Sequence, residues 1–350
     1  MSGRIHFLLP GRLDRRTGGT IYDARMIEEL RRAGHDVVVH ELAGRFPWPD
    51  GQTRAAATAA LAAAEPGETT VVDGLAVAAL DPTAPPPPDV TRVVLIHMPL
   101  DEERGLPYGV RALLRAAEDA WLRRADRVVC TSPFVAGRLV RRGAPAGGVA
   151  VVEPGVDAAP QPERNGHAGP IRLLAVGALT QVKGHATLVR ALARITGLPW
   201  TLEIIGSAAI EPGTADALKN EVQRRGLAGR VYFPGELPPE RVREAYARAD
   251  VFVLPSLYES YGMVLAEAAA HGLPLVATRA GGIPATPAGR AALLVPPEDD
   301  LALARALEPL IENPAARARL ASRAVDAARR MPSWEIAARE FALQLRAARV

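Results

Sequence analysis

The sequence predicts an α/β protein built from two doubly wound parallel sheets, and three observations support this. The chain has 350 residues, which is more than one hydrophobic core usually takes. Short apolar runs alternate with helical patterns along its length, the order typical of parallel sheets covered by helices on both faces. A stretch without periodicity at residues 155–170, rich in proline and glycine, separates the alternation into two series.

The first series predicts six strands, at residues 5–9, 37–40, 70–72, 93–97, 128–130 and 149–152. Amphipathic or alanine-rich helices are predicted between them, for example at residues 20–32 and 111–124. The proline-rich stretch at residues 82–88 is predicted to be a loop within the first domain, since the alternation continues beyond it.

The second series predicts strands at residues 171–176, 202–205, 231–233, 251–254, 275–277 and 293–295. We therefore expect two Rossmann-like domains, residues 1–160 and 170–332, that face one another across a cleft. A last amphipathic helix, carrying Trp334, is expected from about residue 333 to residue 350.

The composition excludes several classes of protein. The net charge is +3, aromatic residues make up 5% and no basic tract occurs, so a nucleic-acid-binding protein is not expected. The single cysteine, Cys130, excludes an internal disulfide and a multi-cysteine metal site, and we expect it to be a buried thiol. Neither a signal peptide nor an apolar run of the ~20 residues that span a bilayer is apparent, which predicts a cytoplasmic protein without a transmembrane segment.

The segment Tyr-Glu-Ser-Tyr-Gly-Met-Val-Leu-Ala-Glu, residues 258–267, is the most informative part of the chain. It follows a buried strand and leads into a helix at residues 263–271, so that Glu259 lies in the loop and Glu267 about one turn inside the helix. Gly262 opens this helix, where free backbone N–H groups attract an anion. Two such glutamates are most often a loop charge and a solvated helix residue. Ligands of parallel sheets, however, bind where strands end, and the arrangement suits a phosphorylated sugar.

Lysine is rare in this chain. Lysine and arginine together number 42, and only Lys183 and Lys219 are lysines. Lysine is a compact charge suited to a diphosphate, whereas arginine is a planar fork. Lys183 follows the strand at residues 171–176 and precedes a helix, which is where a phosphate-binding cation is expected. Lys219 lies in a polar helical segment and is expected to be solvated.

A histidine and a glycine-rich loop complete the candidates in the first half. His97 ends the strand at residues 93–97, where a side chain faces the ligand crevice of a doubly wound sheet. The loop at residues 10–20 contains Gly18 and Gly19 before Thr20. Glycine at such a place usually serves a tight turn, and no dinucleotide or ATP phosphate-binding motif is present.

These motifs together resemble the retaining family 4 glycosyltransferases (glycosyl transferases group 1), which have the GT-B fold. The resemblance rests on the two glutamates after Phe-Val-Leu-Pro-Ser, on Lys183-Gly184 and on further segments at residues 176–179, 204–207, 231–235 and 274–278. It covers residues 4–345 and is looser in the first half.

The resemblance implies a role for each candidate residue. Residues 1–160 would bind the acceptor and residues 170–332 the nucleotide-sugar donor, with the C-terminal helix crossing back to the first domain. Glu259 would hold hydroxyls of the donor sugar and Glu267 those of the ribose, with His97 beside the sugar. Donor or diphosphate binding is implied for Gly19, Thr20, Lys183, Gly206, Gly262 and Met263.

The chain departs from the family pattern at one position. Family members pair the lysine with an arginine shortly before it, and Ala178 occupies the matching position here. Arg279, or an arginine of the other domain, is a candidate replacement. No Asp-x-Asp motif occurs, so we expect no metal site and a metal-independent reaction in which Lys183 and helix-start amides stabilise the leaving diphosphate.

We therefore predict a retaining hexosyltransferase with no cofactor, which moves a sugar from a nucleotide diphosphate, UDP in preference to GDP, to a small soluble acceptor. A non-catalytic nucleotide-sugar-binding subunit and a GT-B epimerase or phosphorylase are the alternatives. The acids Asp101, Glu102 and Glu103 follow His97 closely and favour a basic or N–H-bearing acceptor: an amino sugar, an aminocyclitol or a pterin-like heterocycle.

Overall fold

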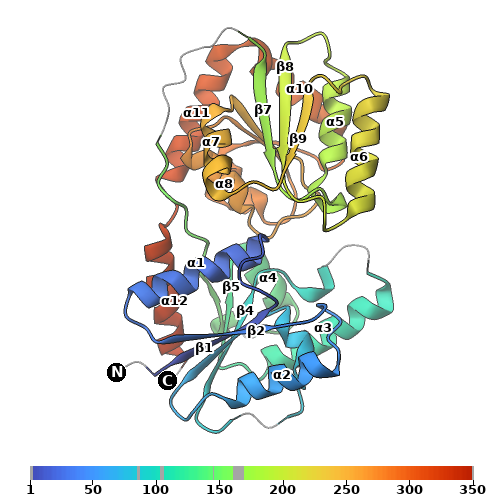
Figure 1. The fold of residues 1–350 in the computed structure, drawn as a ribbon. Helices are drawn as coiled ribbons and strands as arrows, with labels where there is room; N and C mark the ends of the chain where they lie inside the picture. The colour runs from blue at the N-terminus through green and yellow to red at the C-terminus, as the bar shows by residue number, and fades with distance from the viewer. Residues whose placement is uncertain (1–2, 85–86, 103–105, 145, 161–168, 349–350) are drawn as a thin grey trace. The chain divides into compact units, whose positions relative to one another are not determined.

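A computed structural model of the chain describes residues 3–84, 87–102, 106–144, 146–160 and 169–348 (Figure 1). The chain forms two compact units. Unit 1 consists of Met1–Gly155 and Pro332–Val350, and unit 2 is the continuous stretch Val156–Met331.

Unit 1 contains a six-stranded parallel sheet in the order β2-β1-β3-β4-β5-β6. Its strands are short and apolar, because helices cover both faces and leave no solvated side. Their bounds are β1 Ile5–Pro10, β2 Val37–Leu42, β3 Thr69–Asp73, β4 Thr91–Ile96, β5 Arg127–Cys130 and β6 Val149–Val151.

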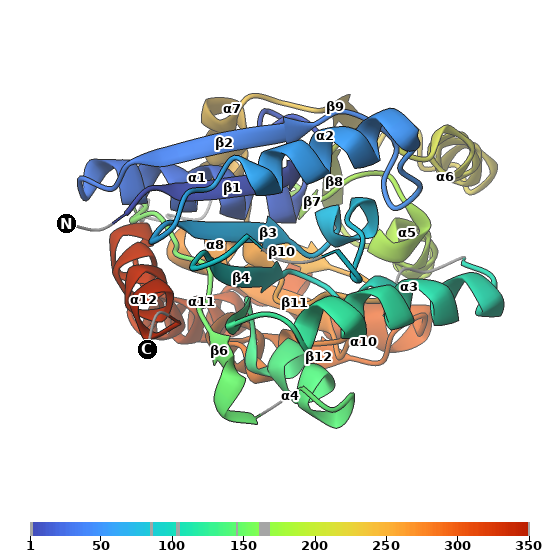
Figure 2. The same cartoon turned by 90° about the horizontal axis from the view of Figure 1, so that it is seen from below.

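The helices of unit 1 divide between the two faces of the sheet. Helices α2 (Gly51–Ala62), α3 (Tyr108–Leu122) and α4 (Pro133–Arg141) pack on one face around a core that includes Trp121 and Cys130. Helix α1 (Gly18–Arg32) covers the other face together with α12 (Trp334–Ala347), which runs beside it (Figures 1 and 2).

Helix α12 packs on the rest of unit 1 through aromatic contacts at its start and in its middle. The Trp334 ring meets Tyr22 of α1 edge-on at 5.8 Å, and Phe341 stacks on Phe7 of β1 at 6.1 Å. The helix start lies so close to Gly155 that a Cβ there would overlap the backbone of Trp334. The last helix is therefore an integral part of the unit that holds the first strands.

Unit 2 contains the second six-stranded parallel sheet, in the order β12-β11-β10-β7-β8-β9. In the central strand β10 every side chain is buried, and successive residues alternate between two hydrophobic clusters on opposite faces, Val251 and Val253 on one, Phe252 and Leu254 on the other. The bounds are β7 Ile171–Val176, β8 Trp200–Ile205, β9 Val231–Gly235, β10 Val251–Leu254, β11 Leu275–Thr278 and β12 Leu293–Val295.

Helices again cover both faces of this sheet. One face packs against α5 (His185–Ala193), α6 (Pro212–Arg224) and α10 (Asp300–Glu312). The other packs against α7 (Pro239–Arg248), α8 (Met263–Ala270), α9 (Pro287–Ala291) and α11 (Pro314–Ala328). Short 3-10 turns complete the chain: Ala76–Ala79, Leu100–Glu102, Ala146–Gly148, Gln181–Lys183 and Ile283–Ala285.

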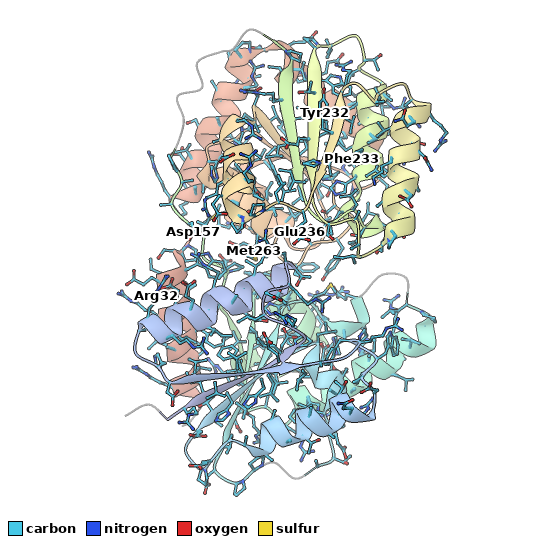
Figure 3. The ribbon with its side chains drawn as sticks, in the orientation of Figure 1. Arg32, Asp157, Tyr232, Phe233, Glu236 and Met263 are labelled. Atoms are coloured by element: carbon cyan, nitrogen blue, oxygen red, sulfur yellow. The ribbon has the colours of Figure 1, made fainter. Side chains whose placement is uncertain are left out.

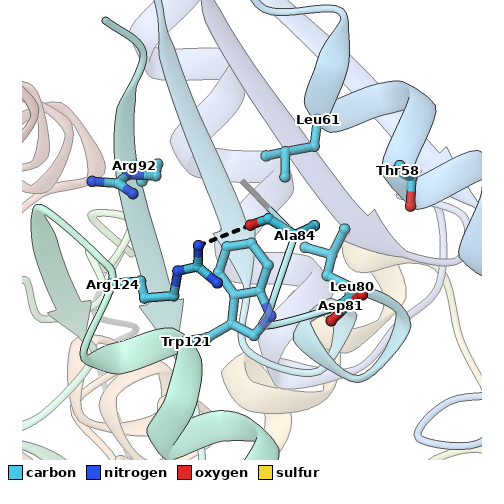
Figure 4. Close-up of a pocket in the computed structure, with 8 residues that line it drawn as sticks. All are labelled: Thr58, Leu61, Leu80, Asp81, Ala84, Arg92, Trp121 and Arg124. Carbon is cyan, nitrogen blue, oxygen red and sulfur yellow. Dashed lines mark hydrogen bonds between the residues drawn. The ribbon is translucent and has the colours of Figure 1, made fainter. Parts of the chain in front are cut away.

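Two hollows lie away from the carboxyl ends of the strands, where the predicted site residues are found. In unit 1 a cavity of about 30 Å³ lies beside Trp121, where Arg124 donates a hydrogen bond to the Ala84 carbonyl (Figure 4). In unit 2 a hollow of about 280 Å³ lies over the amino-terminal part of β7 and β8, bordered by Arg248 and the half-exposed Tyr232. Tyr232 and Phe233 of β9 are marked in Figure 3.

The two sheets confirm the predicted α/β, doubly wound class. Strands β7, β10 and β12 have the predicted bounds, and most others extend by one or two residues. Strands β4 and β6 end one residue earlier than predicted, so that His97 follows β4 and does not end it. Helix α1 begins at Gly18, two residues before the expected start, because Thr17 caps it. Among the helices that the structure describes, none combines the length and the apolar character needed to cross a membrane.

Candidate active site

Two adjacent central strands of unit 2 bring Lys183 and Glu259 together. Strand β7 is followed by the turn Gln181–Lys183, and β10 is followed by the loop that carries Glu259. The Nζ atom of Lys183 lies 2.6 Å from Oε1 of Glu259, and their side chains are 26% and 11% exposed. The two motif residues are thus an ion pair at the carboxyl end of the sheet, partly open to solvent.

The same carboxylate oxygen also receives a neutral hydrogen bond. The hydroxyl of Ser256 donates to Oε1 of Glu259 at 2.7 Å, and the backbone carbonyl of Ser256 accepts a bond from the Thr278 hydroxyl. Lysine and serine thereby fix one oxygen of Glu259. A ligand hydroxyl would be received by the other oxygen, since a carboxylate has several acceptor sites.

Glycines let the loops of this site approach one another closely. A Cβ on Gly184 would overlap the carbonyl oxygen of Pro255, and one on Gly281 would overlap that of Glu259. The N–H of Gly282 donates to the Glu259 carbonyl at 2.7 Å. Gly206 has a packing role of the same kind, since a Cβ there would overlap the carbonyl oxygen of Gly177.

Helix α8 begins at the site as the sequence predicts. Its N-cap is Gly262, whose φ of 87° is in the left-handed region that favours glycine. The following N–H groups, starting with that of Met263, have no carbonyl one turn earlier in the helix, and they carry its positive dipole end. Met263 is half-buried and is marked in Figure 3.

Glu267 is oriented by a tyrosine from the neighbouring helix α7. The hydroxyl of Tyr246 donates to Oε2 of Glu267 at 2.9 Å, and the Tyr246 ring stacks on His271 at 5.0 Å. Burial, and then the charge of Glu267, hold the pKa of Tyr246 well above its usual range, so it remains a neutral donor. The tyrosine fixes one carboxylate oxygen of a half-buried glutamate.

His185 supports the loop after β7. It is buried, and its Nε2 lies 3.3 Å from the carbonyl oxygen of Gly177. Burial lowers the pKa of His185 to about 4, so the ring is neutral and its Nε2–H donates to that carbonyl. Arg279, the candidate replacement for the missing arginine, is exposed and donates to the backbone carbonyl of Leu294 at 3.0 Å.

In unit 1, three side chains meet where β3 and β4 end. His97 follows β4, Asp73 is the last residue of β3 and Asp23 comes from α1. The Nε2 atom of His97 lies 2.9 Å from Oδ1 of Asp23 and 3.2 Å from Oδ2 of Asp73. Burial lowers the pKa of His97, but Asp23 and then Asp73 outweigh it and raise the pKa to about 10.

Gly19 and Thr20 occupy the start of helix α1 beside this cluster. A Cβ on Gly19 would come within 3.1 Å of the His97 ring, so the glycine lets the ring lie against the helix. The Thr20 hydroxyl donates to the Arg15 carbonyl at 2.5 Å and contacts the Thr17 hydroxyl at 2.9 Å. Its side chain belongs to the helix cap, and the hydroxyl is already bonded within the protein.

Among the described residues, one group of histidine and carboxylate side chains has an arrangement that could hold a metal ion. It is the same cluster of Asp23, Asp73 and His97, whose candidate ligand atoms all lie within 4.8 Å of one another. Hydrogen bonds from the ring nitrogen to the two carboxylates account for the short contacts equally well.

The acids expected at the acceptor side are paired with arginines. Asp101 lies 3.0 Å from Nη1 of Arg142, and Glu102 forms an ion pair with Arg138. Glu103, the third acid, lies outside the described residues. Each of the two described acids is therefore paired within the protein, Asp101 with an arginine that also contacts Glu118 and Asp119.

Comparison with known proteins places the chain in a family. The family model described as "Glycosyltransferase Family 4" matches residues 69–159, and the one described as "Glycosyl transferases group 1" matches residues 170–313. The chain belongs to glycosyltransferase family 4. The first match contains Asp73 and His97, and the second contains Lys183, Glu259 and Glu267.

Several curated proteins resemble this family 4 chain. The D-inositol 3-phosphate glycosyltransferase of Corynebacterium diphtheriae is 32% identical over 245 residues, which are 65% of this chain and 57% of that protein. The glycogen synthase of Mycobacterium tuberculosis is 32% identical over 241 residues, 67% of this chain and 57% of that protein. The chain thus spans little more than half the length of these relatives.

Solved structures share the fold over the whole chain. The sucrose-phosphate synthase of Thermosynechococcus elongatus has a TM-score of 0.79 at 23% identity, covering 98% of both chains. The Anabaena protein HepE, solved with UDP and glucose, has a TM-score of 0.77 at 20% identity and covers 98% of this chain and 99% of its own. These likenesses confirm the GT-B fold of the family 4 chain.

The structure groups the predicted site residues by unit. Lys183, Glu259, Gly262 and Met263 surround the end of β7 and β10, and Glu267 follows in the same helix as Met263. The residues that orient them were not predicted from the sequence: Ser256, Tyr246, Gly281 and Gly282 in unit 2, and Asp23 and Asp73 in unit 1. The adjacent glycines after β11 and the aspartate that ends β3 are signals that could have been used.

Replacing Lys183 with arginine is expected to lower kcat/KM about tenfold or more, even though the charge is kept. The lysine stem passes within 3.4 Å of where a Cβ on Gly177 would lie, so a planar guanidinium would have to displace Glu259 or the loop, and misplacement by about 1 Å can have an effect of this size. Steady-state kinetics of Lys183→Arg test it. Lys219→Arg, at the exposed second lysine, is the matched control. Equal activity of Lys183→Arg and wild type would show that the lysine is not required.

Proposed function

We propose that the chain is a retaining hexosyltransferase that moves a sugar from a nucleotide diphosphate to a small soluble acceptor. The observation that carries the proposal is the ion pair of Lys183 and Glu259, at the ends of two central strands and beside the start of helix α8. The pair supplies a cation for a phosphate and a carboxylate for a sugar hydroxyl. HepE, a protein of the same fold, was solved with UDP and glucose, which favours a UDP-sugar over a GDP-sugar.

Each residue has a proposed role in this reaction. Glu259 holds hydroxyls of the donor sugar through its second oxygen, and Glu267 holds those of the ribose. Lys183 and the N–H groups at Gly262 and Met263 stabilise the diphosphate as it leaves. Gly206 lets the ends of β7 and β8 approach one another. On the side of unit 1, His97, Gly19 and Thr20 contribute to binding, Thr20 through its backbone and the helix cap.

The proposed chemistry needs no external base. The acceptor oxygen attacks the anomeric carbon from the face that the diphosphate leaves, so the C–O bond to phosphate breaks as the new glycosidic bond forms. The departing phosphate oxygen takes the acceptor proton. Lys183 and the helix start carry the charge that develops there, and we propose on this ground that the reaction is metal-independent.

Three measurements test the function. Thermal shift with UDP-, GDP- and ADP-sugars identifies the donor, because a ligand that binds only the folded protein raises its stability. Proton NMR of the product reports the anomeric configuration, which should match that of the donor. Activity in excess EDTA reports metal dependence. Donor binding without hydrolysis or transfer would support the binding-subunit alternative, and donor conversion without acceptor would support an epimerase.

The class of acceptor is a further part of the proposal. An amino sugar, an aminocyclitol or a pterin-like compound was predicted from acids that the structure pairs with arginines, so we propose a hydroxyl acceptor of any charge. A panel of neutral, cationic and anionic acceptors, assayed by release of UDP, distinguishes the classes. Strong selectivity for cationic acceptors that Glu102→Gln abolishes would restore the original prediction.

Replacing Glu267 with alanine is expected to weaken binding of the nucleotide about tenfold or more. A hydrogen bond to a charged group contributes about 1.5–3 kcal/mol, and about 1.4 kcal/mol corresponds to a tenfold change. Isothermal titration with UDP measures the effect. Tyr246→Phe removes the bond that orients the carboxylate, together with a longer contact of 3.3 Å to the Val264 carbonyl, and should give a smaller loss in the same direction. Unchanged affinity in Glu267→Ala would contradict the ribose assignment.

A further inference from the structure

One ring nitrogen of His97 is held by two carboxylates. Nε2 lies 2.9 Å from Asp23 Oδ1 and 3.2 Å from Asp73 Oδ2, so its proton is shared between them. Asp73 is itself fixed, because its Oδ1 accepts a hydrogen bond from the N–H of Leu75 at 2.6 Å. This nitrogen has no capacity left for a substrate.

The rest of the ring is enclosed on two further sides. Gly19 lies against one side, and the ring of Tyr22 meets His97 edge-on at 5.2 Å. The side chain of His97 is 19% exposed, whereas those of Asp23 and Asp73 are 1% and 6% exposed. Nδ1 makes no hydrogen bond to any residue in the described part of the chain. The exposed remainder of the ring therefore includes the one nitrogen that is still available.

The charges around the ring favour its protonated form. Asp23 from α1 and Asp73 from the end of β3 are the charged groups that face it, while Tyr22 and the Thr131 hydroxyl, which contacts the His97 carbonyl, are neutral. Burial raises the pKa of Asp23 to about 6, against the lowering effect of His97. The buried Oδ2 of Asp23 has no hydrogen-bond partner among the described residues. A cation beside it offsets part of that cost.

We propose that Asp23 and Asp73 are positioning residues that keep His97 as an imidazolium and leave its Nδ1–H as a hydrogen-bond donor to a substrate oxygen. The oxygen belongs to a hydroxyl or phosphate group of the sugar nucleotide, and in this respect the inference rests on the proposed function. An imidazolium that is already protonated cannot accept the acceptor proton. His97 therefore binds and stabilises and does not act as a general base, consistent with transfer of that proton to the leaving phosphate.

NMR titration of histidine-labelled protein tests the proposal without any substrate. The signals of His97, assigned by their loss in His97→Gln, should stay protonated to well above pH 8, in line with the pKa of about 10. In Asp73→Asn the midpoint should fall by about one unit or more, since a neighbouring opposite charge shifts a pKa by that amount. A midpoint in wild type near the ordinary value of about 6.5 overturns the proposal.

Kinetics separate positioning from a merely structural role. In Asp73→Asn, kcat/KM should fall as the pH approaches the lowered midpoint of about 9 or below, where wild type should stay nearly flat. Asp126→Asn, which alters the paired carboxylate of Arg92 elsewhere in unit 1, is the matched control and should keep the flat profile. If Asp73→Asn unfolds, the wild-type titration still decides. A uniform loss at every pH would indicate a structural role and contradict the proposal.

Metal binding is the other possible use of the cluster, and the same samples report it. Addition of equimolar Mn²⁺ should leave the His97 signals unbroadened. Selective broadening there, removed by Asp23→Asn, would assign the cluster to a metal ion and overturn the proposal. A high midpoint in a protein that binds no sugar nucleotide would instead refute the proposed function and leave the charge state of His97 established.

Discussion

Replacing Glu259 with alanine is expected to lower kcat by about tenfold to a hundredfold while leaving the affinity for UDP within about twofold. The glutamate is proposed to touch the sugar and not the nucleotide, and a hydrogen bond to a charged group contributes about 1.5–3 kcal/mol. In the free protein its Oε1 is already fixed by Lys183 and Ser256. The carboxylate is thus already positioned to receive the sugar. Its removal should therefore lower kcat and leave the affinity for UDP nearly unchanged.

Steady-state kinetics with saturating donor and calorimetry with UDP measure the two effects separately. Glu259→Gln keeps the shape of the side chain but removes the charge that pairs with Lys183, and it should fall between wild type and Glu259→Ala. Glu312→Ala, at an exposed position of α10, is the control. A variant of Glu259 with reduced UDP affinity and unchanged kcat would move this residue from the sugar to the nucleotide.

Replacing Arg142 with methionine is expected to destabilise unit 1 by about 3–5 kcal/mol. The guanidinium is only 7% exposed, and Nη1 lies 2.5 Å from Oε2 of Glu118, whose side chain is fully buried. It also contacts Asp101 at 3.0 Å and Asp119 at 2.6 Å. Removing the arginine leaves a carboxylate in the core of the unit with no cation, which is the costly way to break a buried pair.

Thermal unfolding at two pH values checks this result and its cause. Burial raises the pKa of Glu118 to about 7, against the lowering effect of Arg142. A raised folded-state pKa means that the folded protein favours the protonated acid, so the ionised form is destabilising at higher pH. The loss in Arg142→Met should therefore be larger at about pH 8 than at about pH 6, and the double variant Arg142→Met, Glu118→Leu should recover part of it. Arg138→Met, at an ion pair whose arginine is exposed, is the control. Equal losses of stability in Arg142→Met and Arg138→Met would contradict this explanation.

The fold was predictable because it depends on local signals. Continuous apolar runs of three to six residues mark strands that are covered on both faces, and β10 shows why: its side chains alternate between two cores. The ends of the strands were harder to predict where the position of a strand in the sheet decides them. Strand β9 continues through Pro234 to Gly235 because it lies at the edge of the sheet, where a missing N–H is tolerated.

The candidate site was predictable only in part. Lys183 and Glu259 follow strands, and strand ends show in the sequence, so both were found although 76 residues separate them. Asp23 lies in the middle of a helix, 74 residues before His97, and no local pattern distinguishes it from a surface acid. The acids after His97 illustrate the limit from the other side. Their charge is visible in the sequence, but the arginines that pair with Asp101 and Glu102 come 41 and 36 residues later.

The return of helix α12 to unit 1 has a consequence for the order of biosynthesis. The first strands leave the ribosome early, but the helix that covers β1 beside α1 is translated only after Val156–Met331. Unit 2 is one uninterrupted stretch and can complete its core as soon as it emerges. Unit 1 is therefore begun first and completed last. Until α12 is made, the side chains that later pack on Trp334 and Phe341 are accessible to chaperones.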